Sequence, residues 1–158
     1  MYKVGYIKDV QGTNYLGIKF SYSAVVDYLE ALKTFINDDD LYTTLVTNQQ
    51  ARDKKEGHTH HMTVINVMEM KKLFETFGDF HDRINLIQSM DILDLEMLGV
   101  GKAERDGKVA YFVVCDSSTL DEIRSSLDLP KQNFHITLGF DPKDVFGVSK
   151  STDSLIGL

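Results

Sequence analysis

The sequence predicts an α+β protein whose sheet is mostly antiparallel. Short segments with helical periodicity alternate with short β-rich segments, and two adjacent β-rich segments form a clear hairpin signal. No linker, low-complexity tract or long-period repeat divides the sequence, so we expect residues 1–158 to form a single domain. A chain of 158 residues can bury about two thirds of its unfolded surface, so its core is sufficient for folding.

The first half of the chain contains two predicted strands. Residues 15–21 are short and β-rich, which predicts a strand. From Ser23 onward apolar residues recur at helical spacing, and the acidic run at 37–40 ends this helix. We expect the charged stretch 49–57 to be an exposed loop and residues 60–66 to form the second strand.

The second half repeats the alternation of helices and strands. A helical region is predicted from 69 to 89, with a break near Gly78. Residues 92–104 alternate like a strand, and residues 108–115 return as its hairpin partner after a turn signal. A short helix follows, and residues 133–140 form the last clear strand.

The composition is that of a soluble globular protein, with 42% hydrophobic and 26% charged residues. Cys115 is the only cysteine, which excludes a disulfide scaffold and is compatible with a reducing compartment. No window approaches the ~20 apolar residues of a membrane span, and the N-terminus does not resemble a secretory signal. We therefore expect a cytoplasmic protein without membrane contact, located in the host cytoplasm if its source is a virus.

The charge balance limits the size of the substrate. The chain has 24 acidic and 17 basic residues, which gives a net charge of −7. Proteins that bind long nucleic acids are usually basic, because phosphate neutralisation supplies much of that affinity. We therefore expect no long nucleic acid as a partner, whereas a small phosphate compound in one pocket is compatible with this charge. The sequence does not define the oligomeric state.

Two of the predicted strands share one pattern of histidine, apolar residue, threonine and apolar residue. The pattern occurs as His61-Met-Thr63-Val and again as His135-Ile-Thr137-Leu. Side chains alternate between the faces of a strand, so each histidine shares a face with its threonine while the apolar residues face a core. If the two strands lie near each other, two imidazoles and two hydroxyls converge on one groove.

This set of side chains suits phosphodiester chemistry without a metal or other cofactor. The imidazole pKa is about 6.5, so one ring can be neutral while the other is protonated. The neutral ring can accept a proton from the attacking hydroxyl or water, and the protonated ring can donate one to the leaving oxygen. The hydroxyls of Thr63 and Thr137 can bind the non-bridging phosphate oxygens. The sequence does not say whether His61 or His135 is the base.

Paired His-x-Thr motifs, each on a strand and about half a chain apart, resemble the 2H phosphoesterase superfamily. The chain is most similar to the small bacterial and phage branch named for "Swiss Army knife" RNA-repair-like proteins. Besides the two motifs, residues 16–20, 134–140 and 144–148 carry the resemblance. It implies two pseudo-symmetric lobes of mostly antiparallel sheet with helices outside and a central cleft. It also implies that His61 and His135 are catalytic and that both threonines bind the phosphate.

The resemblance implies a phosphodiesterase that acts on small nucleotides. Members of the superfamily include RNA 2′,3′-cyclic phosphodiesterases and phage enzymes that destroy cyclic-oligonucleotide defence signals. We expect cyclic or short oligonucleotides as the substrate, because the acidic charge disfavours long RNA. One alternative is an RNA 2′,3′-cyclic phosphodiesterase of RNA end processing. Another is a nucleotide-binding protein without turnover.

Three further residues are candidates for substrate binding. Lys102 and Lys150 could add positive charge near a phosphate. Tyr15 could stack on a base, and Tyr42 and Tyr111 are alternatives for that role.

His58 and His60 offer an alternative interpretation as metal ligands, because they share a strand face. No cysteine or carboxylate lies at a familiar spacing nearby, so we expect no metal and place both histidines at the cleft mouth or facing solvent. The segment Gly99-Val-Gly101 suggests a dinucleotide-binding loop, but it precedes a hairpin rather than a helix. We expect a kink or bulge in a strand there.

Overall fold

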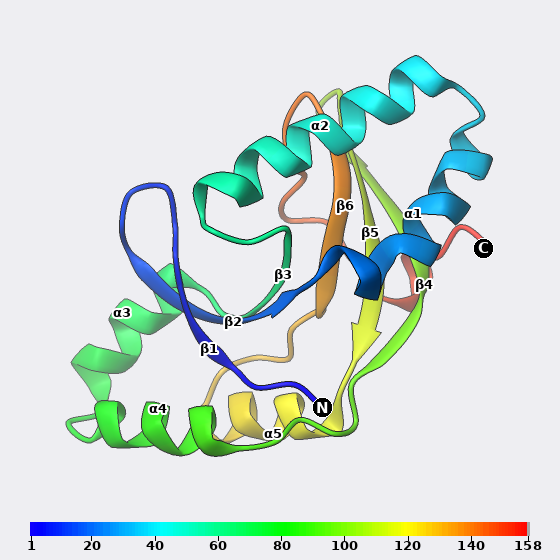
Figure 1. Ribbon diagram of the computed structural model, residues 1–158. Helices are drawn as coiled ribbons and strands as arrows, with labels where there is room; N and C mark the ends of the chain where they lie inside the picture. The colour runs from blue at the N-terminus through cyan, green and yellow to red at the C-terminus, as the bar shows by residue number, and fades with distance from the viewer. Residues whose placement is uncertain (158) are drawn as a thin grey trace.

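The computed structural model describes residues 1–157, in which five α-helices accompany two three-stranded antiparallel sheets (Figure 1). Within these residues no helix has both the length and the apolar character needed to cross a membrane. The elements follow in the order β1 (Gly5–Lys8), β2 (Asn14–Phe20), α1 (Tyr22–Ile36), α2 (Asp39–Lys55), β3 (His60–Ile65), α3 (Val67–Thr76), α4 (Phe80–Ser89), β4 (Glu96–Arg105), β5 (Lys108–Asp116), α5 (Ser118–Ser126), β6 (His135–Asp141) and a final 3-10 turn (Thr152–Ser154).

The two sheets have the same topology, which confirms the predicted pair of pseudo-symmetric lobes. In the first lobe the β1–β2 hairpin is followed by two helices and then by β3, which pairs with β2. In the second lobe the β4–β5 hairpin is followed by α5 and then by β6, which pairs with β5. Both β3 and β6 are therefore edge strands, and they lie next to each other (Figure 1). These two edge strands carry the two His-x-Thr motifs.

One helix of each lobe contacts the motif strand of the other lobe. Helix α2 precedes β3 in the chain but lies along β6, and α5 precedes β6 but contacts β3 (Figure 1). The close approach of α2 to β6 depends on Gly139, because a Cβ there would come within 2.8 Å of the Leu45 side chain. This exchange of helices keeps the two edge strands side by side.

One apolar core runs through both sheets. It includes Met62 and Val64 from β3 together with Ile136 and Leu138 from β6. A smaller cluster around Phe112 covers the opposite face of the second sheet. Because the apolar residues of each motif point into the large core, the histidine and threonine of each motif point away from it, as the alternation predicts.

The expectation of an exposed loop at 49–57 is wrong. Helix α2 continues to Lys55, and its buried face carries Leu45, Gln49 and Asp53, which are spaced four residues apart. This spacing is helical, but two of the three buried side chains are polar. The apolar periodicity that marks most helices is therefore missing from this one.

Three local features of the first lobe and of β4 can be compared with the expectations from the sequence. The short strand β1 was not anticipated. The acidic run at 37–40 both ends α1 and begins α2, where the side chain of Asp38 accepts a hydrogen bond from the backbone N–H of Leu41. The bulge expected near the paired glycines is confirmed by a shift of register in β4 between Met97 and Gly99.

Arg124 joins the segments that hold the two motif strands. Its side chain is 2% exposed and donates to both carboxylate oxygens of Glu69, at 2.9 and 2.8 Å. It also donates to the carbonyl oxygens of Val64 at 2.8 Å and of Pro130 at 3.0 and 2.8 Å. Val64 belongs to β3 and Pro130 lies shortly before β6, so one guanidinium links both sides of the cleft.

We predict that Arg124→Met lowers the free energy of unfolding by about 3–5 kcal/mol, because a buried charge network loses one partner and keeps the other. Urea denaturation followed by circular dichroism would measure the change. Arg83→Met is the matched control, since Arg83 pairs with the exposed Asp79 and should cost at most about 1 kcal/mol. Equal effects of the two substitutions would contradict the role given to Arg124.

Candidate active site

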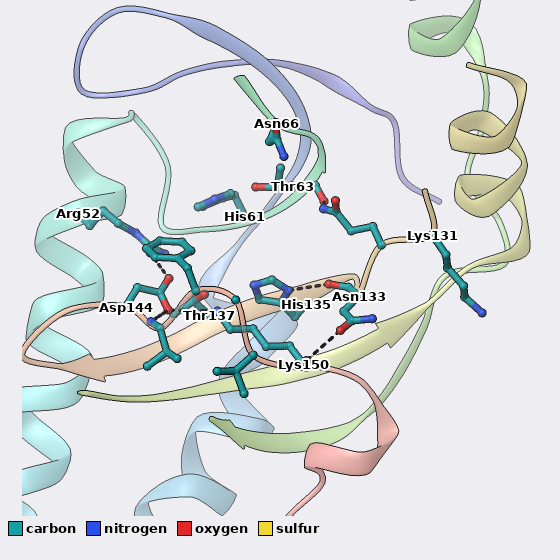
Figure 2. A pocket seen from close by; sticks show the side chains of 15 residues that line it. Arg52, His61, Thr63, Asn66, Lys131, Asn133, His135, Thr137, Asp144 and Lys150 are labelled. Atoms are coloured by element: carbon teal, nitrogen blue, oxygen red, sulfur yellow. Dashed lines mark hydrogen bonds and ion pairs between the residues drawn. The ribbon is translucent and has the colours of Figure 1, made fainter. Parts of the chain in front are cut away.

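A pocket of about 440 Å³ opens between the two motif strands (Figure 2). His61 and Thr63 line it from β3, and His135 and Thr137 line it from β6. The structure therefore brings together the four residues that the two motifs predict. A cavity of this size is in the usual range for a small-molecule ligand.

The carboxylate of Asp53 positions the ring of His61. Oδ2 of Asp53 lies 3.1 Å from Nδ1 of His61 and also accepts a hydrogen bond of 3.0 Å from Nε2 of Gln49. The ring of Tyr15 packs edge-on against the imidazole, with 5.9 Å between the ring centroids. Because Nδ1 faces the carboxylate, Nε2 is the nitrogen that remains for chemistry in the pocket.

His135 has a neutral partner instead of a carboxylate. Its Nδ1 lies 2.7 Å from the carbonyl oxygen of Asn133, which can only accept, so Nδ1 carries the proton and Nε2 of the neutral ring has a free lone pair. Burial and then the charge of Lys150 lower the pKa of His135 to about 4, although the bond to Asn133 opposes this shift. A charge on His61 would act in the same direction. At neutral pH the ring of His135 is therefore uncharged.

A chain of alternating charges runs along the pocket beside the two histidines (Figure 2). Arg52 donates from Nε to Asp53 at 2.9 Å and from Nη1 to Asp144 at 2.6 Å. Lys150 donates from Nζ to the other oxygen of Asp144 at 3.2 Å. The two carboxylates balance the two cations of this group. A proton on His61 would therefore give the site a local positive charge, which would attract a phosphate.

The carboxyl groups of Asp53 and Asp144 both remain ionised. Burial acts to raise the pKa of Asp53, but the hydrogen bond and charge of His61, followed by Arg52, hold it below its ordinary value. Burial likewise acts to raise the pKa of Asp144, but the charges of Lys150 and Arg52 hold it below its ordinary value. The carboxylate next to Nδ1 of His61 is therefore negatively charged.

Of the three further residues predicted to contact substrate, only Lys150 lines the pocket. The hydroxyl of Tyr15 donates to Glu56 at 2.6 Å, and its ring supports the first motif from behind. Lys102 lies on β4 and pairs with Glu104 at 2.6 Å. Tyr15 and Lys102 are therefore placed outside the pocket, because each is engaged elsewhere in the fold.

His58 and His60 do not lie at a cleft mouth or face solvent as expected. The side chain of His58 is buried, with Nε2 at 3.0 Å from Nδ1 of His61 and 3.6 Å from Oδ2 of Asp53. His60 is buried on the opposite face of β3, and its two ring nitrogens have no hydrogen-bond partner within residues 1–157. Of the two histidines that were considered as joint metal ligands, only His58 lies beside the carboxylate of Asp53.

A different trio could hold a metal ion. Asp53, His58 and His61 each offer one ligand atom, and these atoms lie within 4.8 Å of one another. Three such ligands suit a transition metal. Asp53 was not anticipated as a ligand, because it lies in the segment 49–57 that was expected to be a loop.

Other residues of the site also escaped the sequence analysis. Arg52 lies on the unrecognised part of α2, and its ion pair to the distant Asp144 follows from the tertiary structure alone. Asp144 and Phe146 lie in the segment 144–148, which was noted only for its resemblance to a family. No local pattern marked Phe146, which lies between Val145 and Gly147 beyond the end of β6.

The comparison with protein families agrees with this geometry. The model of the Swiss Army Knife, 2H phosphoesterase domain (2H-SAK), matches residues 14–146. The chain belongs to this 2H phosphoesterase family. The family consists of phosphodiesterase-type hydrolases, which implies a small nucleotide or RNA as the substrate of this 2H phosphoesterase. Neither a curated protein nor a solved structure matches the chain.

We predict that the imidazole of His135 titrates with a pKa of about 4 and that Lys150→Gln raises this pKa. A nearby positive charge disfavours the imidazolium, so its removal makes protonation easier. NMR titration of the ring resonances, assigned with a His135→Asn variant, would measure both values. Lys102→Gln is the matched control and should leave the pKa of His135 unchanged. A wild-type His135 that titrates near its ordinary pKa would contradict the prediction.

Proposed function

We propose that this 2H phosphoesterase hydrolyses cyclic or short oligonucleotides without a metal, using His135 as the general base and His61 as the general acid. The observation that carries the proposal is the difference between the partners of the two rings. His135 faces a carbonyl oxygen at Nδ1 and is uncharged, which suits a base. His61 faces the ionised carboxylate of Asp53, which stabilises a positively charged ring and suits an acid.

In the first step a ribose 2′-hydroxyl next to the scissile phosphate attacks the phosphorus. Nε2 of His135 takes the hydroxyl proton as the new O2′–P bond forms. Nε2 of His61 gives its proton to the departing 5′-oxygen as the old P–O bond breaks. Thr63 and Thr137 donate hydrogen bonds to the non-bridging oxygens and hold the phosphorus in line. The products are a 2′,3′-cyclic phosphate and a free 5′-hydroxyl.

In the second step water opens the cyclic phosphate with the roles of the histidines reversed. His61, now neutral, takes a proton from water, and His135, now protonated, gives its proton to the leaving ribose oxygen. Both rings return to their starting states, so the proton count balances over the two steps. Proton transfer of this kind contributes about 10²–10⁴-fold to the rate.

A second candidate function uses only the second reaction. An RNA 2′,3′-cyclic phosphodiesterase would open a terminal cyclic phosphate with the same four residues. The net charge of −7 and the small volume of the pocket favour a short nucleotide over a long RNA strand. A protein that binds nucleotides without turnover is a third candidate, but binding alone would not require two histidines with different proton-transfer partners.

The test is incubation of the protein with 2′,3′-cyclic mononucleotides, cyclic dinucleotides, cyclic trinucleotides and 2′–5′ oligoadenylates, with the products identified by mass. We expect hydrolysis of at least one cyclic or short oligonucleotide. His61→Ala or His135→Ala should each lower the rate by about 10² or more. His81→Ala is the matched control, because His81 is exposed on α4 and outside the pocket.

Two outcomes of this experiment would contradict the proposal. Loss of hydrolysis in the presence of EDTA would show that a metal takes part, and Asp53, His58 and His61 would be its first candidate ligands. Near-normal turnover in either histidine variant would remove that histidine from the mechanism. Cleavage of terminal 2′,3′-cyclic phosphates alone would favour the second candidate function.

We also predict that Asp53→Asn lowers kcat by about 10- to 100-fold, as is usual for groups that orient a histidine. Asp53 does not line the pocket, so KM should change little while kcat falls. A merely structural role for Asp53 would instead lower the fraction of folded protein, which circular dichroism measures. Asp79→Asn, which breaks an exposed ion pair elsewhere, should leave both kcat and KM unchanged.

A further inference from the structure

The segment that follows β6 forms one wall of the pocket. Residues 144–148 and Lys150 all line the cavity, and the backbone N–H of Lys150 donates to Oδ1 of Asn133 at 3.0 Å. The segment therefore returns from the end of β6 toward its beginning and passes the catalytic face of the strand. Within residues 1–157, Phe146 is the one phenylalanine, tyrosine or tryptophan that lines this pocket.

The side chain of Phe146 is exposed, whereas two other residues of its segment are buried. Phe146 is 74% exposed, whereas Val145 is 1% and Lys150 is 5% exposed. The phenyl ring therefore stands out from an anchored segment at a place where it meets the solvent inside the pocket. Because the ring lines the pocket and is largely uncovered, it is available to contact a ligand there.

The backbone on both sides of Phe146 is held in place. Nη1 of Arg105 donates to the carbonyl oxygen of Phe146 at 3.1 Å, and the N–H of Val145 donates to Oδ1 of Asp144 at 2.8 Å. Gly147 follows with a φ of 76°, a conformation that favours glycine, and a Cβ there would clash with the guanidinium of Arg105. The ring is therefore presented on a fixed backbone, which reduces the entropy lost when a ligand binds.

The ring also lies close to the groups that surround the phosphate position. Nζ of Lys150 is 5.5 Å from the ring centroid of Phe146 and 5.5 Å from that of Phe112. The ring of Phe112 in turn packs edge-on against His135, with 5.6 Å between centroids. One lysine therefore lies between the exposed ring and the ring that packs against His135, so Phe146 and His135 face the same part of the pocket.

We propose that Phe146 forms a nucleobase subsite, in which a base of the substrate stacks on its ring while the attached phosphate lies between His61 and His135. This inference rests on the proposed function and adds the part of the substrate that is recognised outside the reaction centre. Every base has a π-face, so a single phenyl ring selects nucleotides over sugar phosphates without selecting one base.

The absence of tryptophan from the sequence allows a direct test. Phe146→Trp places a single indole reporter at the proposed subsite. Its fluorescence is titrated with adenosine 2′,3′-cyclic phosphate, with cyclic di-AMP and with base-free 1-O-methylribose 2′,3′-cyclic phosphate. Leu93→Trp is the matched control, because Leu93 is 76% exposed and does not line the pocket.

We expect at least one of the two nucleotides to quench the indole of Phe146→Trp in a saturable manner. The base-free compound should not quench it, and no compound should quench Leu93→Trp in this way. Quenching by neither nucleotide, or equal quenching by the base-free compound, would overturn the assignment of the subsite.

Kinetics provide a second readout on the unlabelled protein. Phe146→Ala should lower kcat/KM for a nucleotide substrate by about 5- to 100-fold, mainly through KM, as expected for loss of base–aromatic stacking. Phe146→Tyr should retain most of the activity because it keeps the ring. Hydrolysis of the base-free compound should be the same in all three proteins, and an equal loss on both kinds of substrate would overturn the proposal.

The two readouts separate this inference from the proposed function. Quenching of Phe146→Trp by a nucleotide, together with hydrolysis of no cyclic or short oligonucleotide by the wild-type protein, would support the subsite and contradict the proposed activity. Hydrolysis of cyclic di-AMP without any quenching by it would support the activity and contradict the subsite.

Discussion

The packing of α2 against β6 is the constraint on which the site depends. Helix α2 belongs by sequence to the first lobe, yet it lies on the edge strand of the second, at a distance that only glycine at position 139 permits. This contact keeps β6 beside β3. It also brings the last turns of α2, with Arg52 and Asp53, to the place where the two strands meet. One helix therefore both closes the cleft and supplies the carboxylate behind His61.

The lobes are symmetric in topology but not in the surroundings of their histidines. Each motif strand presents a histidine and a threonine to the same cavity, so the fold by itself would make the two rings equivalent. The carboxylate of Asp53 on one side and the carbonyl oxygen of Asn133 on the other remove this equivalence. Phosphodiester cleavage needs one proton acceptor and one donor, and the pairing of similar motifs with dissimilar partners meets that need.

The sequence predicted the parts of the site that follow from local pattern. Alternation along a strand was enough to place His61 with Thr63 and His135 with Thr137, and to turn their neighbours into the core. It could not reveal Asp53, because the buried face of α2 is partly polar and lacks the apolar periodicity on which helix prediction depends. Nor could it separate Lys150 from Lys102, since only the return of the chain after β6 decides which lysine reaches the pocket.

The wall formed by residues 144–150 lies outside both sheets, and the match to the family model ends within it, at residue 146. The histidines and threonines of the proposed mechanism lie on strands, while the surface facing the rest of the ligand is a short stretch of irregular backbone. With such a division, exchange of a few loop residues would be enough to change selectivity. The proton-transfer apparatus would pass unchanged from one ligand preference to the next.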